Sequence, residues 1–262
     1  MKQQTVWRAV GAVAVALGVS ACGGGDSDPV MPTAGDLCGS VGLQPKVFNG
    51  SNCANPRNSP VVQLAVLQGG NTYTCSGVML TPNRVLTAAH CLPAGTSAVA
   101  ATVWDGNGGS QLLSAQSWVV HPQYLESYSS LVNDAAVITL NGAMPNPTMP
   151  LLVSQRSKKG DEVFFAGWGL PSGDLAVGFA KLTKVTDWQL ELSFRGQLSN
   201  SCAGDSGGPV YRSVGGRMGV VGLTSTGTTR ACGAADDSLF TNTQTDKVLG
   251  FIRSQAPGAA EI

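Results

Sequence analysis

The chain has 262 residues, a formal net charge of zero and 34 glycines, and only 12% of its residues are charged. A neutral chain without a basic run gives no sign of nucleic-acid binding. The length allows one large all-β unit or two small domains, and many glycines with few charges indicate short strands and tight turns.

The N-terminus has the layout of a secretory signal. Lys2 and Arg8 precede an apolar run, residues 9–19, that is too short to span a bilayer comfortably. The run ends in Val-Ser-Ala-Cys, which resembles the bacterial lipobox and predicts a signal peptide over residues 1–21 with a lipid on Cys22. The alternative is an ordinary signal peptide that is cut nearby.

The segment after Cys22 is rich in glycine and reads as a flexible tether over residues 23–36. In lipoproteins of this kind, a residue other than Asp after the cysteine, here Gly23, implies the outer membrane. The protein is therefore expected to be exported, either as an outer-membrane or cell-envelope lipoprotein whose only membrane contact is this lipid, or as a secreted protein.

Several short segments rich in β-branched and apolar residues are separated by Gly, Asn, Pro and Ser clusters. They are residues 61–68, 73–80, 84–91, 135–140, 162–168, 181–192 and 218–226. Short strands at this spacing indicate a barrel or a sandwich. Residues 141–150 hold three prolines and divide the chain into two halves, and helical spacing of apolar residues predicts a short helix over 246–256.

The cysteines fit an oxidising compartment. Without Cys22, six of the seven remain: Cys38, Cys53, Cys75, Cys91, Cys202 and Cys232. An even number in an exported chain indicates disulfides, although sequence alone permits 15 pairings. A metal site is disfavoured because the chain has no CxxC pair and only two histidines, and we expect no cofactor.

Three motifs carry residues that would act together in nucleophilic catalysis. Leu-Thr-Ala-Ala-His-Cys contains His90, Val-Asn-Asp contains Asp134, and Cys-Ala-Gly-Asp-Ser-Gly-Gly-Pro contains Ser206. Each residue alone has an ordinary explanation as a buried histidine or a turn residue. Together they supply a hydroxyl, a base to take its proton and a carboxylate to orient that base.

With these motifs the chain resembles the chymotrypsin/trypsin family of serine proteases, over roughly residues 47–256. Further matches are Phe-Phe-Ala-Gly-Trp-Gly-Leu at 164–170, Gly-Leu-Thr-Ser-Thr-Gly at 222–227 and Ser-Leu-Phe-Thr-Asn-Thr at 238–243. The resemblance implies an all-β fold of two six-stranded antiparallel Greek-key barrels, with the active site between them and a short C-terminal helix. The barrels would span residues 47–145 and 146–262.

The resemblance also implies a role for each residue. Ser206 would attack the scissile carbonyl, His90 would accept and return its proton, and Asp134 would orient the imidazole. The backbone N–H groups of Gly204 and Ser206 would form the oxyanion hole. In this family the carboxylate at Asp205 pairs with an N-terminal amine freed by cleavage.

That pairing requires an activation site. Val47-Phe48-Asn49-Gly50 resembles the family's new N-terminus, so cleavage after Lys46 would free the Val47 amine and make residues 22–46 a tether and propeptide. The alternative is a simple turn before the first strand, because Asn-Gly is a strong turn signal.

The family pattern implies the disulfides Cys75–Cys91 and Cys202–Cys232, which leaves Cys38 with Cys53. The bridge between Cys38 and Cys53 would span the cleavage site, so that a cut propeptide stays attached.

For specificity, the family places Asn200 at the base of the primary pocket, Ser225 as a backbone contact to substrate and Gly227 as the residue that keeps the pocket open. A neutral Asn200 predicts a neutral polar or medium apolar residue before the cut, and another protease to cut at Lys46. Asp236 and Asp237 lie near the other pocket wall, either as solvated loop acids or as a source of a carboxylate.

The preferred hypothesis is a monomeric serine endopeptidase that acts on protein or peptide substrates, made as a zymogen for an activating protease. The alternative is a catalytically inactive binding protein on the same fold. A serine esterase of the α/β-hydrolase type is disfavoured, because the chain lacks GxSxG and has the order His, Asp, Ser.

Overall fold

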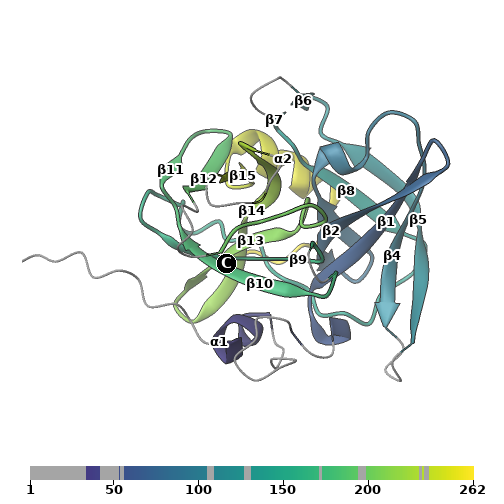
Figure 1. Cartoon of the computed structure of the whole chain (residues 1–262), viewed down its shortest axis with the longest axis horizontal. Helices are drawn as coiled ribbons and strands as arrows, with labels where there is room; N and C mark the ends of the chain where they lie inside the picture. Colours follow the sequence, from purple (N-terminus) through teal and green to yellow (C-terminus); the bar gives the residue numbers. More distant parts are fainter. Residues whose placement is uncertain are drawn as a thin grey trace, which may run out of the picture. The chain divides into compact units, whose positions relative to one another are not determined.

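The computed structural model describes residues 34–41, 53, 56–104, 109–126, 131–170, 173–193, 199–229, 232 and 236–262. The predictions for Cys22, Lys46 and Val47, and for the signal peptide, lie outside these residues. The described residues form two groups of antiparallel strands with a helix at each end of the chain, α1 (Ala34–Gly39) and α2 (Asp246–Gln255) (Figure 1).

The first half of the chain closes into a six-stranded barrel with the order β1-β2-β3-β8-β5-β4. Its strands are β1 (Val61–Gln68), β2 (Asn71–Thr81), β3 (Arg84–Thr87), β4 (Thr96–Trp104), β5 (Ser110–Val120) and β8 (Ala136–Leu140). Alternate residues of β1 point inward, and Leu64 and Val66 pack with Val85 and Ile138 in the barrel core. Closure leaves this sheet without a free edge.

The second half forms a sheet with the order β10-β9-β13-β14-β15-β12-β11. Its strands are β9 (Glu162–Gly167), β10 (Ala176–Lys181), β11 (Lys184–Val185), β12 (Gln189–Ser193), β13 (Pro209–Val214), β14 (Arg217–Gly227) and β15 (Asp237–Asn242). The remaining elements are two 3-10 turns, η1 (Pro56–Asn58) and η2 (Ala89–Cys91), and the short pair β6 (Leu125–Glu126) and β7 (Leu131–Val132).

Strands β10 and β11 are consecutive pieces of one strand, and they lie at opposite edges of this second sheet. Counted as one strand, they make the sheet equivalent to a six-stranded barrel. The switch occurs between two neighbouring residues. The N–H of Leu182 donates to the Asp161 carbonyl beside β9, whereas the N–H of Thr183 donates to the Glu191 carbonyl in β12. The fold is therefore the two-barrel architecture that the sequence predicts, with the helix α2 at its C-terminus.

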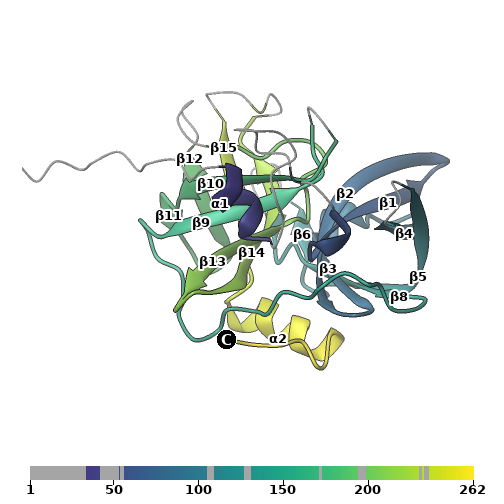
Figure 2. The ribbon, with the colours of Figure 1, turned by 90° about the horizontal axis from the view of Figure 1, so that it is seen from below.

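Helix α1 packs on the second barrel, where Figure 2 shows it over β9 and β10. Leu37 and Val41 are buried, and the Ser40 hydroxyl lies 2.8 Å from that of Tyr211, a fully buried residue of β13. Burial of each such aliphatic side chain stabilises the fold by about 1.5–3 kcal/mol. The segment upstream of the predicted cleavage site is thus part of the core.

The predicted strands agree with the structure with two exceptions. The strand predicted over 84–91 ends at Thr87, and η2 carries the histidine. The strand predicted over 181–192 is interrupted at residues 182–183, between β10 and β11, and again at residues 186–188, where the Thr186 hydroxyl and N–H bond Gln189 across a turn. No helix among the described residues is long and apolar enough to cross a membrane.

Candidate active site

His90 and Asp134 form a hydrogen-bonded pair between the two barrels. The Asp134 side chain is fully buried, and its Oδ2 lies 2.8 Å from Nδ1 of His90, while its Oδ1 accepts the backbone N–H of His90 at 2.9 Å. The two bonds fix the imidazole in one orientation and place a proton on Nδ1, which leaves Nε2 as the free acceptor.

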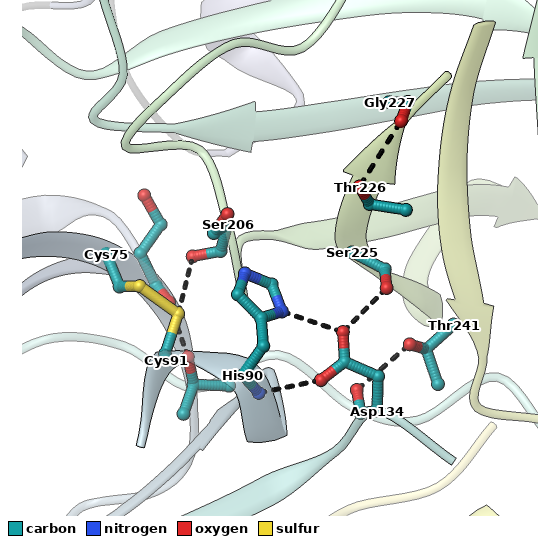
Figure 3. Close-up of polar contacts among 11 residues, drawn as sticks. Cys75, His90, Cys91, Asp134, Ser206, Ser225, Thr226, Gly227 and Thr241 are labelled. Atoms are coloured by element: carbon teal, nitrogen blue, oxygen red, sulfur yellow. Dashed lines mark hydrogen bonds and ion pairs between the residues drawn. A yellow bond between two sulfur atoms is a disulfide. The ribbon is translucent and has the colours of Figure 1, made fainter. Parts of the chain in front are cut away.

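Local structure brings Asp134 to this position. Asn133 adopts a left-handed conformation, with φ of 52°, which asparagine tolerates better than most residues. Its side chain donates to the Gln123 carbonyl at 2.9 Å. From the second barrel, the Ser225 hydroxyl donates to Asp134 Oδ2 at 2.6 Å and the Thr241 hydroxyl to the Asp134 carbonyl at 2.9 Å (Figure 3).

Ser206 lies on a turn between β12 and β13, on the side of the imidazole opposite Asp134 (Figure 3). Gly204 and Gly207 have φ of 97° and 80°, which side-chain-bearing residues rarely adopt. No hydrogen bond joins the Ser206 hydroxyl to His90 within the described residues, and such bonds are often long in proteins without substrate.

Three of the five backbone N–H groups of residues 204–208 donate hydrogen bonds within the described part of the chain. Those of Asp205, Gly207 and Gly208 donate to carbonyl oxygens at 2.7–3.0 Å. Those of Gly204 and Ser206 donate to no acceptor among the described residues. Two unpaired N–H groups on one tight turn form a site for a negatively charged oxygen.

Ser76 on β2 connects this turn to the first barrel. The Ser76 side chain is buried and donates to the Gly204 carbonyl at 2.8 Å, while its oxygen accepts the N–H of Trp168 at 2.9 Å. The Ala203 carbonyl in turn accepts the N–H of Leu170 at 2.9 Å. Because a trans peptide points its C=O and N–H in opposite directions, that bond turns the Gly204 N–H away from Leu170.

Ser76→Ala is expected to lower the free energy of unfolding by about 1–3 kcal/mol, because the buried N–H of Trp168 and the carbonyl of Gly204 both lose their partner. Urea unfolding of the two proteins measures the difference. Ser97→Ala is the matched control, since its hydroxyl makes an exposed bond to the Leu67 carbonyl. Equal midpoints for the two variants would contradict the prediction.

A cavity of about 950 Å³ lies beside Ser206. It is lined by His90, Ser206, Ser201, Thr224–Thr229, Asp236 and neighbouring residues. Asn200 is absent from this lining, because its Oδ1 is turned toward the N–H of Ser201 and the hydroxyl of Ser238. The structure thus places Ser225 and Gly227 at the cavity, while the role of Asn200 as a substrate contact stays a prediction.

Opposing influences act on the pKa of His90. Burial is the largest single influence and lowers the pKa. The charge and hydrogen bond of Asp134, with a smaller contribution from Glu126, raise it, and the result is a pKa above the ordinary 6.5. The pKa of His121, the only other histidine, is lowered by burial.

The direction of the His90 shift predicts the pH profile of acyl transfer. A base must be neutral to accept the serine proton, so kcat/KM is expected to rise with pH through a pKa above 6.5 and to be lost at lower pH. A pH–rate profile with a small ester substrate measures this limb. An apparent pKa below 6.5 for this rise in kcat/KM would instead match His121 and would contradict the assignment of His90 as the base.

Asp205 lies beneath the turn. Its Oδ1 accepts the N–H of Gly169 and its Oδ2 accepts the N–H of Cys202, both at 2.9 Å. Burial raises the pKa of this carboxyl, while the two N–H bonds lower it by less. Asp205 has no cationic partner within the described part of the chain.

The described residues contain three disulfides: Cys75–Cys91, Cys202–Cys232 and Cys38–Cys53. The first two are the pairs that the family pattern implies, and the third is the pair that those two leave over. The first holds the segment with His90 against β2, and the second joins the Ser206 turn to the wall of the cavity. Among the described residues, no cluster of three or more His, Cys, Asp and Glu side chains could hold a metal ion.

Two β-barrels that bring a His–Asp pair and a serine together define the class of two-barrel serine proteases. The comparisons with known proteins agree. The Trypsin family model matches residues 48–249. The chain therefore belongs to the trypsin family, whose members are serine endopeptidases that act on proteins or peptides.

The similar curated proteins are all distant. Kallikrein 1-related peptidase b21 of Mus musculus is 30% identical over 214 residues, covering 67% of this chain and 78% of that protein. Chymotrypsin-like elastase family member 1 of Canis lupus familiaris is 29% identical over 197 residues, covering 63% and 74%. Kallikrein-12 of Homo sapiens is 28% identical over 221 residues, covering 74% and 84%.

Sequence reasoning missed two side chains of the site. Ser76 was unremarkable within a predicted strand, and Ser225 was expected to act through its backbone carbonyl rather than its hydroxyl. The available signal was a small polar residue inside an apolar strand, which is buried only when it has a hydrogen-bond partner.

Proposed function

We propose that this protein is a serine endopeptidase that hydrolyses peptide bonds through an acyl-enzyme. Ser206 is the nucleophile, His90 the general base and then general acid, and Asp134 the residue that orients His90 and stabilises its charged form. The N–H groups of Gly204 and Ser206 stabilise the oxyanion. The observation that carries this proposal is the pair of unpaired N–H groups beside Ser206, together with the His90–Asp134 bond.

Each step of the proposed reaction uses one of these groups. The hydroxyl of Ser206 attacks the carbonyl carbon while Nε2 of His90 takes its proton, and the carbonyl oxygen moves toward the two N–H groups. His90 then returns the proton to the leaving amine. Water repeats the sequence to release the acid. Loss of one such N–H donor typically costs about 3 kcal/mol of transition-state stabilisation.

We further propose that the protein is exported as a zymogen. Cleavage after Lys46 frees the Val47 amine, which pairs with Asp205. Support comes from the carboxylate itself, because it is partly buried, accepts two backbone N–H bonds and has its pKa raised by burial. A cation would relieve the cost of burying this charge. Export, with or without a lipid on Cys22, is supported by the three disulfides.

Labelling with a fluorophosphonate tests the function. The purified protein is labelled before and after cleavage of the Lys46–Val47 bond, with Ser206→Ala as the control. We expect labelling that appears after cleavage and is absent in the variant. Labelling of uncut protein would overturn the zymogen proposal alone. No labelling of either form would overturn the enzyme proposal and favour an inactive binding protein on the same fold.

A further inference from the structure

The lining of the cavity beside Ser206 contains a buried carboxylate. Asp236 is 2% exposed and lines the cavity together with Gly227 and Ser225. Its Oδ1 accepts the N–H of Thr229 at 2.7 Å and the hydroxyl of Thr228 at 3.1 Å. These two bonds hold the carboxylate in one place.

The second oxygen of Asp236 faces the bare backbone of Gly227. A Cβ atom built on Gly227 would lie 2.6 Å from Oδ2 of Asp236, so the carboxylate occupies the space that a side chain at residue 227 would fill. Within the described residues, Oδ2 accepts no hydrogen bond and no Lys, Arg or His pairs with Asp236. The glycine therefore leaves this oxygen open to the cavity.

A buried carboxylate without a cation is costly, and the cost falls when a positive group pairs with it. The cavity, at about 950 Å³, has room for a long side chain. Its remaining polar groups near Asp236 are neutral hydroxyls and backbone groups, such as Ser201, Ser225 and Thr226. Glu126, whose charge acts on His90, is the other carboxylate of the lining, so Asp236 supplies the negative charge beside Gly227 and Ser225.

Resting on the proposed function, we infer that Asp236 determines specificity and selects substrates with a lysine or arginine side chain before the scissile bond. The ammonium or guanidinium group pairs with Oδ2, and the two threonine bonds keep the carboxylate in place. This reverses the preference predicted from Asn200, whose side chain is engaged with Ser201 and Ser238. The carboxylate is supplied by Asp236 and not by residue 200.

One consequence concerns activation. Lys46 lies directly before the predicted cleavage site, so the residue before the bond that must be cut is one that this cavity would accept. Active protein is then expected to cut the Ser206→Ala protein after Lys46, and to leave a Ser206→Ala protein that also carries Lys46→Gln uncut. Equal cutting of both proteins at this bond would count against the inference.

The main test compares peptide substrates that differ only in the residue before the scissile bond: Arg, Lys, Gln, Met and Leu. Rates are normalised to the fluorophosphonate-reactive fraction. We expect kcat/KM for Arg or Lys to exceed that for the others by about 100-fold, and we expect Asp236→Asn to lower the ratio of the Arg rate to the Gln rate by most of that factor. Asp237→Asn is the matched control and is expected to keep the preference.

A measurement on unaltered protein avoids dependence on the folding of the variant. Benzamidine, which carries a cationic amidinium, is expected to inhibit about 100-fold more tightly than its neutral isostere benzamide. Protein that labels at Ser206 but shows no preference for Arg, Lys or benzamidine would overturn this inference and leave the proposed function standing. Absence of labelling would overturn the proposed function itself.

Discussion

Asp134→Asn is expected to lower kcat by about 10⁴-fold. Asp134 accepts three hydrogen bonds, from the backbone N–H of His90, its Nδ1–H and the Ser225 hydroxyl. An amide keeps one acceptor oxygen and presents N–H donors in place of the other. The imidazole then moves its proton to Nε2 to accept from the amide, and it can no longer take the proton of Ser206.

Single-turnover hydrolysis of a peptide ester by purified variant measures the loss, with circular dichroism to establish that the variant is folded. The matched control is Asp246→Asn, which removes an exposed carboxylate paired with Arg156 at 2.9 Å, and it is expected to retain full activity. A loss below tenfold in a folded Asp134→Asn protein would exclude Asp134 as the orienting group.

Gly207→Ala is expected to have the largest effect on stability. The left-handed conformation costs an alanine about 1–2 kcal/mol. The added Cβ would also meet Thr87 Oγ1 and lie 2.5 Å from the Ser76 carbonyl oxygen and 2.8 Å from the Ala88 nitrogen. Overpacking of this kind costs about 1–3 kcal/mol, so the free energy of unfolding should fall by about 2–5 kcal/mol in total.

Urea unfolding measures this change, and a Ser206→Ala background prevents self-digestion. Gly215→Ala separates the two costs, because Gly215 also has a positive φ, of 58°, but has no atom within 4 Å of the added Cβ. We expect Gly215→Ala to lose only the conformational part. If both substitutions lower stability equally, the close approach of the Ser206 turn to the first barrel is not what requires glycine at residue 207.

The sequence predicts some elements well because their signals are local. The strand over 61–68 coincides with β1, since an apolar run is bounded by turn residues. Strands β4, β5 and β13 were not among the predicted segments. Most β5 residues are exposed and five of the eleven are polar, so the strand has no continuous apolar run, and β13 follows directly on the Ser206 motif. Their formation depends on partners distant in the chain.

The residues of the candidate site also divide into those with a local sequence signal and those without one. His90, Asp134 and Ser206 are encoded in local motifs, so the sequence points to each of them. The bond from Ser76 to Gly204 joins residues that lie far apart in the chain. The open oxygen of Asp236 lies against Gly227 in the lining of the cavity. No local pattern encodes these contacts, because they depend on how the two barrels and their loops meet.

Under the proposed activation, the Cys38–Cys53 disulfide and the docked helix α1 would keep the segment upstream of the cut attached to the catalytic chain. The disulfide closes a loop that contains the Lys46–Val47 bond, so a cut there opens the backbone without separating the two pieces. Anything attached upstream of residue 38, including a lipid on Cys22, then remains joined to the enzyme. If the protein is a lipid-anchored zymogen as proposed, a cut at Lys46 alone would not release the enzyme into solution, and release would need a second cut upstream of Cys38 or loss of both the disulfide and the α1 contact.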